Sequence, residues 1–314
     1  MNNNQRNNID TRYFSFSKHL KSMFGEPVYK ISVDAGFTCP NRDGTKGKGG
    51  CLYCSKEGSG ASYIDKELSI TKQLQNSIQQ FKKKRKAQKF IAYFQPFSNT
   101  YAPISHLRKL YNEALSVNEI VGLSIGTRAD IVNGDILDLI EEYDKQTYLW
   151  IEYGLQSIHN KTLQLINRCH TYKEFEDVYF KTKERNCRIC LHIIIGLPGE
   201  SKKDILETAE KISELEPDGI KIHSLYISKD SPIAEDYIRG DINLYEADEY
   251  ISIVADFIER IPPNTIVQRL IGEEKKDKLI APQWILEKST IINKINTELK
   301  KRGTYQGYLY QKSD

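Results

Sequence analysis

Short apolar runs alternate along the chain with longer amphipathic segments. Runs that predict buried strands occupy residues 29–33, 89–94, 122–127, 148–154, 188–195 and 219–225. Between them, apolar residues recur three or four positions apart, which predicts helices at residues 69–86, 104–116, 131–145, 171–186 and 201–215. Strands that alternate with helices predict a parallel sheet with right-handed crossovers. Six such units predict an incomplete (β/α)6 barrel rather than a closed barrel of eight strands.

The pattern is looser beyond residue 225. It predicts a helix at residues 245–261, a break at Pro262-Pro263, a strand at residues 266–270 and an amphipathic helix at residues 283–302. We therefore expect an N-terminal extension (1–27), an α/β core (28–230) and a C-terminal extension (231–314) that covers the open end of the barrel.

Composition narrows the class of protein. The chain has 314 residues, of which 39% are hydrophobic and 28% charged, as in soluble globular proteins. A net charge of +3 is too small to indicate a nucleic-acid-binding protein by itself. No segment approaches the roughly 18 apolar residues of a membrane span, so we expect a cytoplasmic protein with no membrane partner. In a reducing compartment, its six cysteines favour metal or catalytic sites over disulfides.

Three cysteines lie in one loop directly after the first predicted strand. Eleven residues separate Cys39 from Cys51, and two separate Cys51 from Cys54. Loops at the carboxyl ends of barrel strands build active sites, and thiolates bind metals there. A closed zinc site would need a fourth ligand, whereas an iron–sulfur cluster held by three cysteines keeps one iron open. The spacing alone leaves both a zinc loop and an iron–sulfur site open.

Polar residues interrupt or end several predicted strands. Glu152 lies within an apolar run, and a buried carboxylate needs a cationic or hydrogen-bonding partner. His192 lies in the fifth predicted strand, and a lone histidine in a strand is also commonly a core residue. Arg168 has the planar fork that grips a carboxylate, and a surface position between two helices is the less favoured alternative. Further polar candidates at strand ends are Gln95, Asn99, Arg128 and Gln156.

The cysteine loop on a partial barrel resembles the radical S-adenosylmethionine (SAM) superfamily. The commonest spacing in that family is three residues and then two, and the longer run CPNRDGTKGKGGCLYC resembles the Elongator-catalytic-subunit-like subgroup. Within it, the run is similar to a bacterial branch associated with tRNA wobble-uridine maturation. The resemblance extends from about residue 29 to the last helix. It implies a partial (β/α)6 radical SAM barrel with a C-terminal extension.

The resemblance also implies roles for individual residues. Cys39, Cys51 and Cys54 would ligate a [4Fe–4S] cluster whose open iron binds SAM. The Gly-Leu-Gln-Ser segment and the arginine twelve residues after its glutamine resemble SAM contacts of the coproporphyrinogen-oxidising and Elongator-like enzymes. The usual Gly-Gly-Glu segment after the second strand is absent. The residues expected to bind the cofactor are Gln95, Asn99, Arg128, Glu152, Gln156, Arg168 and His192, and no catalytic residue is assigned.

The resemblance implies that the substrate is a tRNA wobble uridine whose 5-carboxymethylaminomethyl group becomes 5-aminomethyl. It implies two partners, tRNA and an external electron donor such as flavodoxin or ferredoxin. The basic run at residues 82–86 is compatible with RNA binding, although a solvated helix end is the commoner explanation. Cys169, Cys187 and Cys190 are interpreted as structural. The alternatives are a radical SAM enzyme for a small metabolite or porphyrin precursor, and a zinc-stabilised RNA-binding module.

Overall fold

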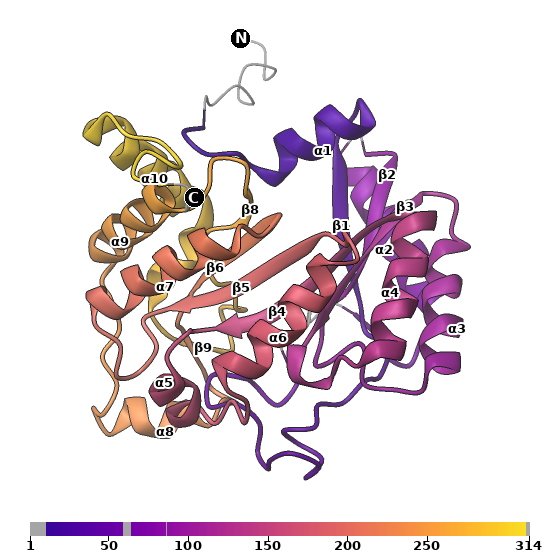
Figure 1. The fold of residues 1–314 in the computed structure, drawn as a ribbon, viewed down its shortest axis with the longest axis horizontal. Coiled ribbons are helices and arrows are strands. Elements are labelled where there is room, and N and C mark those ends of the chain that lie inside the picture. Colours follow the sequence, from indigo (N-terminus) through magenta and orange to yellow (C-terminus); the bar gives the residue numbers. More distant parts are fainter. Residues whose placement is uncertain (1–10, 59–63, 86, 312–314) are drawn as a thin grey trace.

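A curled sheet of seven parallel strands forms the centre of the protein (Figure 1). The computed structural model describes residues 11–58, 64–85 and 87–311. The first six strands match the predicted positions, and the seventh, β8, pairs in parallel with β6. The sheet therefore has one strand more than the predicted (β/α)6 barrel. In spatial order the strands are β1 (Val28–Val33), β2 (Lys89–Phe94), β3 (Ile120–Thr127), β4 (Tyr148–Gln156), β5 (Ile189–Ile195), β6 (Gly219–Ser224) and β8 (Ile266–Arg269).

Helices between the strands cover the outer face of the sheet (Figure 1). All five predicted helices are confirmed, although Lys86, at the predicted end of the first, lies outside the described residues. At the starts of four of them, a side chain accepts a backbone N–H group, as in the capping boxes of Thr171 and Ser201. The five are α2 (Ile70–Lys84), α3 (Ile104–Leu115), α4 (Gly134–Gln146), α6 (Tyr172–Lys183) and α7 (Lys202–Leu215).

Several short elements escaped prediction. Helix α1 (Phe16–Phe24) packs against β1 and β8, and Figure 1 shows it at the end of the sheet opposite the cysteine loop. Among the others, β7 and β9 form a separate two-stranded sheet. These others are η2 (Ala129–Ile131), α5 (Asn160–Leu165), β7 (Ile227–Ser228), α8 (Ile233–Ile238) and β9 (Leu279–Ala281).

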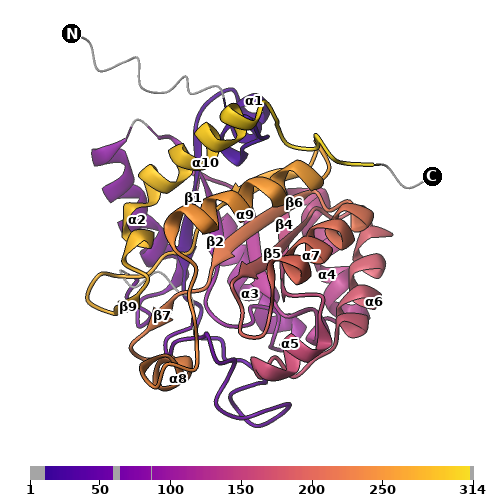
Figure 2. The ribbon, with the colours of Figure 1, turned by 90° about the vertical axis from the view of Figure 1, so that its left-hand side faces the viewer.

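The C-terminal extension is built into the barrel. Helix α9 (Ala247–Arg260) packs beside α10 (Lys288–Arg302), which follows the short helix η3 (Gln283–Glu287) (Figure 2). Because β8 also comes from this segment, the boundary expected at residue 230 divides a single sheet. Within the described part of the chain, no helix is long and apolar enough to cross a membrane.

If α10 belongs to the cooperative core, Leu299→Ala should lower the free energy of unfolding by about 2–5 kcal/mol, because it leaves a cavity at a fully buried position. Urea unfolding followed by circular dichroism measures the change. Leu309→Ala, at a side chain that is 47% exposed, is the control and should leave the curve nearly unchanged. An equally small effect of both substitutions would show that α10 unfolds independently.

Candidate active site

The three cysteines of the loop after β1 lie around one cavity at the carboxyl ends of the strands. Cys51 is buried, whereas Cys39 and Cys54 are partly exposed. Positive φ angles of 79° and 82° at Gly49 and Gly50 turn the chain just before Cys51, in a conformation that glycine adopts without strain. The loop composition therefore lets eleven residues fold back so that all three thiols face the same space.

Side chains on both sides of the loop hold it in place. The Asn41 amide donates to the carbonyl of Asn167 at 2.5 Å and to Cys51 Sγ at 3.5 Å. In return, Asn167 donates to the Gly50 carbonyl at 2.7 Å, and the Cys169 thiol donates to Asn41 Oδ1 at 3.0 Å. Cys169 thus supports the loop through a hydrogen bond, in keeping with the structural role that the sequence suggested.

The spacing of the three sulfur atoms bears on the metal they bind. Among the described residues, the sulfur atoms of Cys39, Cys51 and Cys54 do not all lie within 4.8 Å of one another. Two thiolates that share one zinc ion lie closer than that, because each Zn–S bond is about 2.3 Å long. The three sulfur atoms are therefore not grouped as closely as three ligands of one zinc ion would be.

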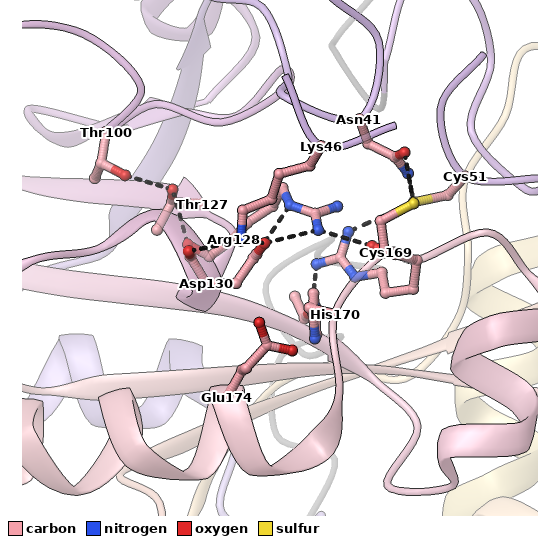
Figure 3. Close-up of polar contacts among 12 residues, drawn as sticks. Asn41, Lys46, Cys51, Thr100, Thr127, Arg128, Asp130, Cys169, His170 and Glu174 are labelled. Atoms are coloured by element: carbon pink, nitrogen blue, oxygen red, sulfur yellow. Dashed lines mark hydrogen bonds and ion pairs between the residues drawn. The ribbon is translucent and has the colours of Figure 1, made fainter. Parts of the chain in front are cut away.

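Two buried arginines, Arg128 (Figure 3) and Arg168, place positive charge beside the loop. Arg168 Nη1 lies 3.6 Å from Cys51 Sγ, and Arg128 Nη2 donates to the Arg168 carbonyl at 2.7 Å. Asp130 pairs with Arg128 at 3.0 Å and with Lys46 of the loop at 2.7 Å. Burial opposes ionisation of Asp130, but Arg128 outweighs it and lowers the pKa to about 2. This chain of contacts ties the end of β3 to the cysteine loop.

The arginines also affect the pKa of a loop thiol. Burial alone would raise the pKa of Cys51, but the charges of Arg168 and Arg128 outweigh it and hold that pKa below the usual value. In contrast, burial and the neighbouring Cys51 raise the pKa of Cys54 to about 11. A bound cation reverses such a rise, because a coordinating thiol is deprotonated outright. The donor set is therefore chemically suited to iron.

Glu152 is the centre of a buried ionic network inside the barrel. Its fully buried carboxylate contacts the ammonium groups of Lys30 on β1 and Lys221 on β6. It also accepts hydrogen bonds from Ser124 on β3 and, at 2.7 Å, from His192 Nε2 on β5. The prediction that this carboxylate needs cationic partners is confirmed. One side chain thereby joins strands from both halves of the sheet.

The network fixes the charge of its members. Burial alone would raise the pKa of Glu152, but Lys221, Lys30 and the His192 hydrogen bond hold it well below its usual range. Burial lowers the pKa of His192 to about 4, so the imidazole is neutral and Nε2 donates to Glu152. Burial also lowers the pKa of Lys221 to about 7, although Glu152 favours its charged form.

The structure brings most of the candidate residues to one place. With the three cysteines, the residues that line the cavity include Gln95, Arg128, Glu152, Gln156, Arg168 and His192. Asn99 lies behind this lining, where its amide donates to the carbonyls of Pro96 at 3.0 Å and Gly126 at 2.8 Å. Its contacts connect the loop after β2 to β3, and its role in cofactor binding stays a prediction.

Sequence reasoning missed two members of the site. Lys30 and Tyr93 lie on β1 and β2 and face the interior, where the Tyr93 hydroxyl is 3.0 Å from Lys221 Nζ. Lys30 interrupts the apolar pattern of β1 as Glu152 does that of β4. Two opposite charges within buried strands were the available signal, since each requires the other.

Fold and cysteine loop together define a radical SAM barrel. A model of the Radical SAM superfamily matches residues 39–212, and a model of the Radical_SAM C-terminal domain matches residues 217–301. The chain therefore belongs to the radical SAM superfamily, whose members are enzymes. The family implies a [4Fe–4S] cluster and SAM as cofactors.

Individual relatives refine this placement. The chain is 39% identical to the uncharacterized protein YtqA of Bacillus subtilis over 97% of its own length and 95% of that protein. It is 37% identical to protein YhcC of Escherichia coli, covering 92% of each. Elongator complex protein 3 of Saccharomyces cerevisiae is 24% identical over 51% of this chain and 29% of that protein.

A solved structure supports the fold. Elp3 of the archaeon Methanocaldococcus infernus superposes with a TM-score of 0.68 at 16% identity, covering 89% of this chain. This chain spans 64% of that protein's length, so the comparison concerns the shared barrel.

At pH 6, where Lys221 is protonated, Glu152→Gln should lower the free energy of unfolding by about 3–5 kcal/mol, because it leaves the buried ammonium group of Lys221 and the partly buried one of Lys30 without their carboxylate. Urea unfolding measures the loss. The double variant Glu152→Gln/Lys221→Met should be less destabilised, since one of the two cations is gone.

The matched control is Glu119→Gln, which removes the carboxylate of an exposed pair with Lys82 and should barely move the unfolding midpoint. A midpoint for Glu152→Gln equal to that of the wild type would refute the role of Glu152 as the stabilising centre of the network.

Proposed function

We propose that this radical SAM enzyme converts 5-carboxymethylaminomethyluridine to 5-aminomethyluridine at the wobble position of tRNA. The observation that carries the proposal is a cavity of about 860 Å³ that opens between β1 and β8 and has exposed Arg85 and Lys275 at its edge. Such an opening suits a substrate whose reactive arm enters the barrel while a larger anionic body stays outside. The similarity to Elongator complex protein 3 and the character of the cysteine loop support the same substrate class.

The cofactors and the protein would divide the work. Cys39, Cys51 and Cys54 would hold the cluster, and Gln156, Arg168 and His192 would line the SAM side of the cavity. When bound, the cluster and SAM supply a 5′-deoxyadenosyl radical that takes up one hydrogen atom. The protein orients the substrate carbon and excludes competing reactions. Flavodoxin or ferredoxin would supply the initial electron near the partly exposed Cys39 and Cys54.

The proposed reaction balances as an oxidation. The carbon between the amine and the carboxylate of the substrate would lose two electrons in all, and SAM would be the oxidant that takes them up. Water adds to the resulting carbon–nitrogen double bond, and the carbon–nitrogen bond breaks. The products are the 5-aminomethyl group and glyoxylate, while SAM ends as methionine and 5′-deoxyadenosine. The reacting carbon lies next to a carboxylate, so this assignment requires a substrate with an acidic arm.

The alternatives differ in substrate or in metal. A small acidic metabolite or a porphyrin precursor would fit inside the cavity without RNA outside it. A zinc-stabilised RNA-binding module is disfavoured by the family and by the spacing of the three sulfur atoms.

Replacing Cys39, Cys51 or Cys54 by Ala should abolish the cluster, because each thiol would supply one iron ligand. Iron and sulfide counting after anaerobic reconstitution measures the loss, which should be nearly complete. Cys187→Ala is the control, since that buried thiol packs in the core and should leave the iron content unchanged. Full iron content in all three loop variants, or a wild-type protein that binds zinc alone, would contradict the cluster assignment.

Cells that lack the gene should accumulate 5-carboxymethylaminomethyluridine at the expense of 5-aminomethyluridine and nucleosides derived from it. Mass spectrometry of nucleosides from digested tRNA measures both forms. Complementation with the wild-type gene should restore the profile, and complementation with Cys51→Ala should not. Identical nucleoside profiles with and without the gene would rule out this tRNA substrate and leave the radical SAM class intact.

A further inference from the structure

Two cavities inside the barrel meet along a shared wall. The cavity at the cysteine loop and the larger one between β1 and β8 have several lining residues in common. Because β1 and β8 are the two edges of the open sheet, the larger cavity provides a route from outside to the cysteines. The shared residues are Tyr93, Gln95, Lys221, His223, Tyr226 and Arg269.

The charge of the larger cavity is predominantly positive. Its acidic lining residues, Glu273 and Glu274, are outnumbered by basic ones. Glu273 already pairs with Arg269 at 2.9 Å and with Lys288. Charge complementarity therefore favours an anionic ligand. The basic lining residues are Lys30, Arg85, Lys221, Arg269, Lys275 and Lys288.

A polar atom at the shared wall lacks a partner within the described structure. His223 Nε2 is buried and makes no hydrogen bond to another described residue. Burial and the nearby charge of Arg269 hold the pKa of His223 well below its usual range, so its ring is neutral. A buried polar nitrogen without a partner is costly, and a ligand that accepts its N–H would remove that cost.

Lys221 offers a second donor close by. Its ammonium group contacts Glu152 and lies 3.0 Å from the Tyr93 hydroxyl. Glu152 is shared with Lys30, so one carboxylate pairs with two lysines. The wall between the two cavities thus presents cationic groups and a neutral donor to the same space.

We propose that the substrate enters between β1 and β8 and that Lys221, His223 and Arg269 bind its carboxylate. This inference rests on the proposed function, since that substrate carries a carboxylate next to the carbon that reacts. Anchoring the carboxylate at the shared wall positions this carbon toward the cysteine loop. The three residues are therefore assigned as binding and positioning residues that select acidic substrates.

The test compares the nucleoside 5-carboxymethylaminomethyluridine with its uncharged carboxamide. Isothermal titration calorimetry on the reconstituted holoenzyme, with SAM present, gives the dissociation constant of each. The wild type should bind the acid at least about tenfold more tightly than the amide, as expected for charge-assisted hydrogen bonds. Arg269→Gln should reduce that preference to about twofold or less, without weakening the binding of the amide.

Lys221→Met is a second variant with the same expected loss of preference, in case Arg269→Gln folds poorly. The control is Arg260→Gln on α9, because the Arg260 side chain is 24% exposed, against 21% for Arg269, and also pairs with a glutamate. It should keep the full preference for the acid.

Three outcomes would overturn the inference: a wild type that does not prefer the acid, variants that keep the preference, or variants that lose affinity for SAM instead. The last would assign these residues to the cofactor. None of these results bears on the nucleoside profile of cells lacking the gene, so failure of the inference and failure of the tRNA assignment are distinguishable.

Discussion

The ion pairs of Glu152 with Lys30 and Lys221 are the constraint around which the barrel interior is organised. Glu152 lies on the central strand β4, and its partners come from β1 and β6, far apart in the order of the sheet. An unpaired charge at this depth would cost several kcal/mol, so the three side chains need one another. The network thereby connects three strands across the interior of the curled sheet.

A second set of contacts positions the cysteine loop on that frame. Asn41, Asn167 and the Arg128–Asp130 pair connect the loop to the chain after β3 and after α5. The loop is long and rich in glycine, so its conformation depends on these side chains rather than on regular secondary structure. Arg168 both contacts Cys51 and donates to the Gly154 carbonyl, which links the thiols to the bulged end of β4.

The open side of the sheet distinguishes this protein from a closed barrel. Seven parallel strands leave β1 and β8 unpaired with each other, and α1 covers one end of the gap between them. A closed barrel is filled by side chains, whereas this one retains a cavity that reaches the cysteines from the side. The proposed substrate route uses this open side of the sheet.

The sequence by itself determined the alternation of strands and helices and the location of the cysteine loop, because apolar periodicity and glycine content are local properties. The predicted bounds of strand β2 matched the structure residue for residue. The position of Glu152 within an apolar run predicted that its carboxylate has a cationic or hydrogen-bonding partner. Only the tertiary structure decided that these cations are Lys30 and Lys221, that β8 joins the sheet, and that Asn99 lies behind the cavity lining. Each of those facts depends on contacts between residues distant in sequence, about which a local pattern holds no information.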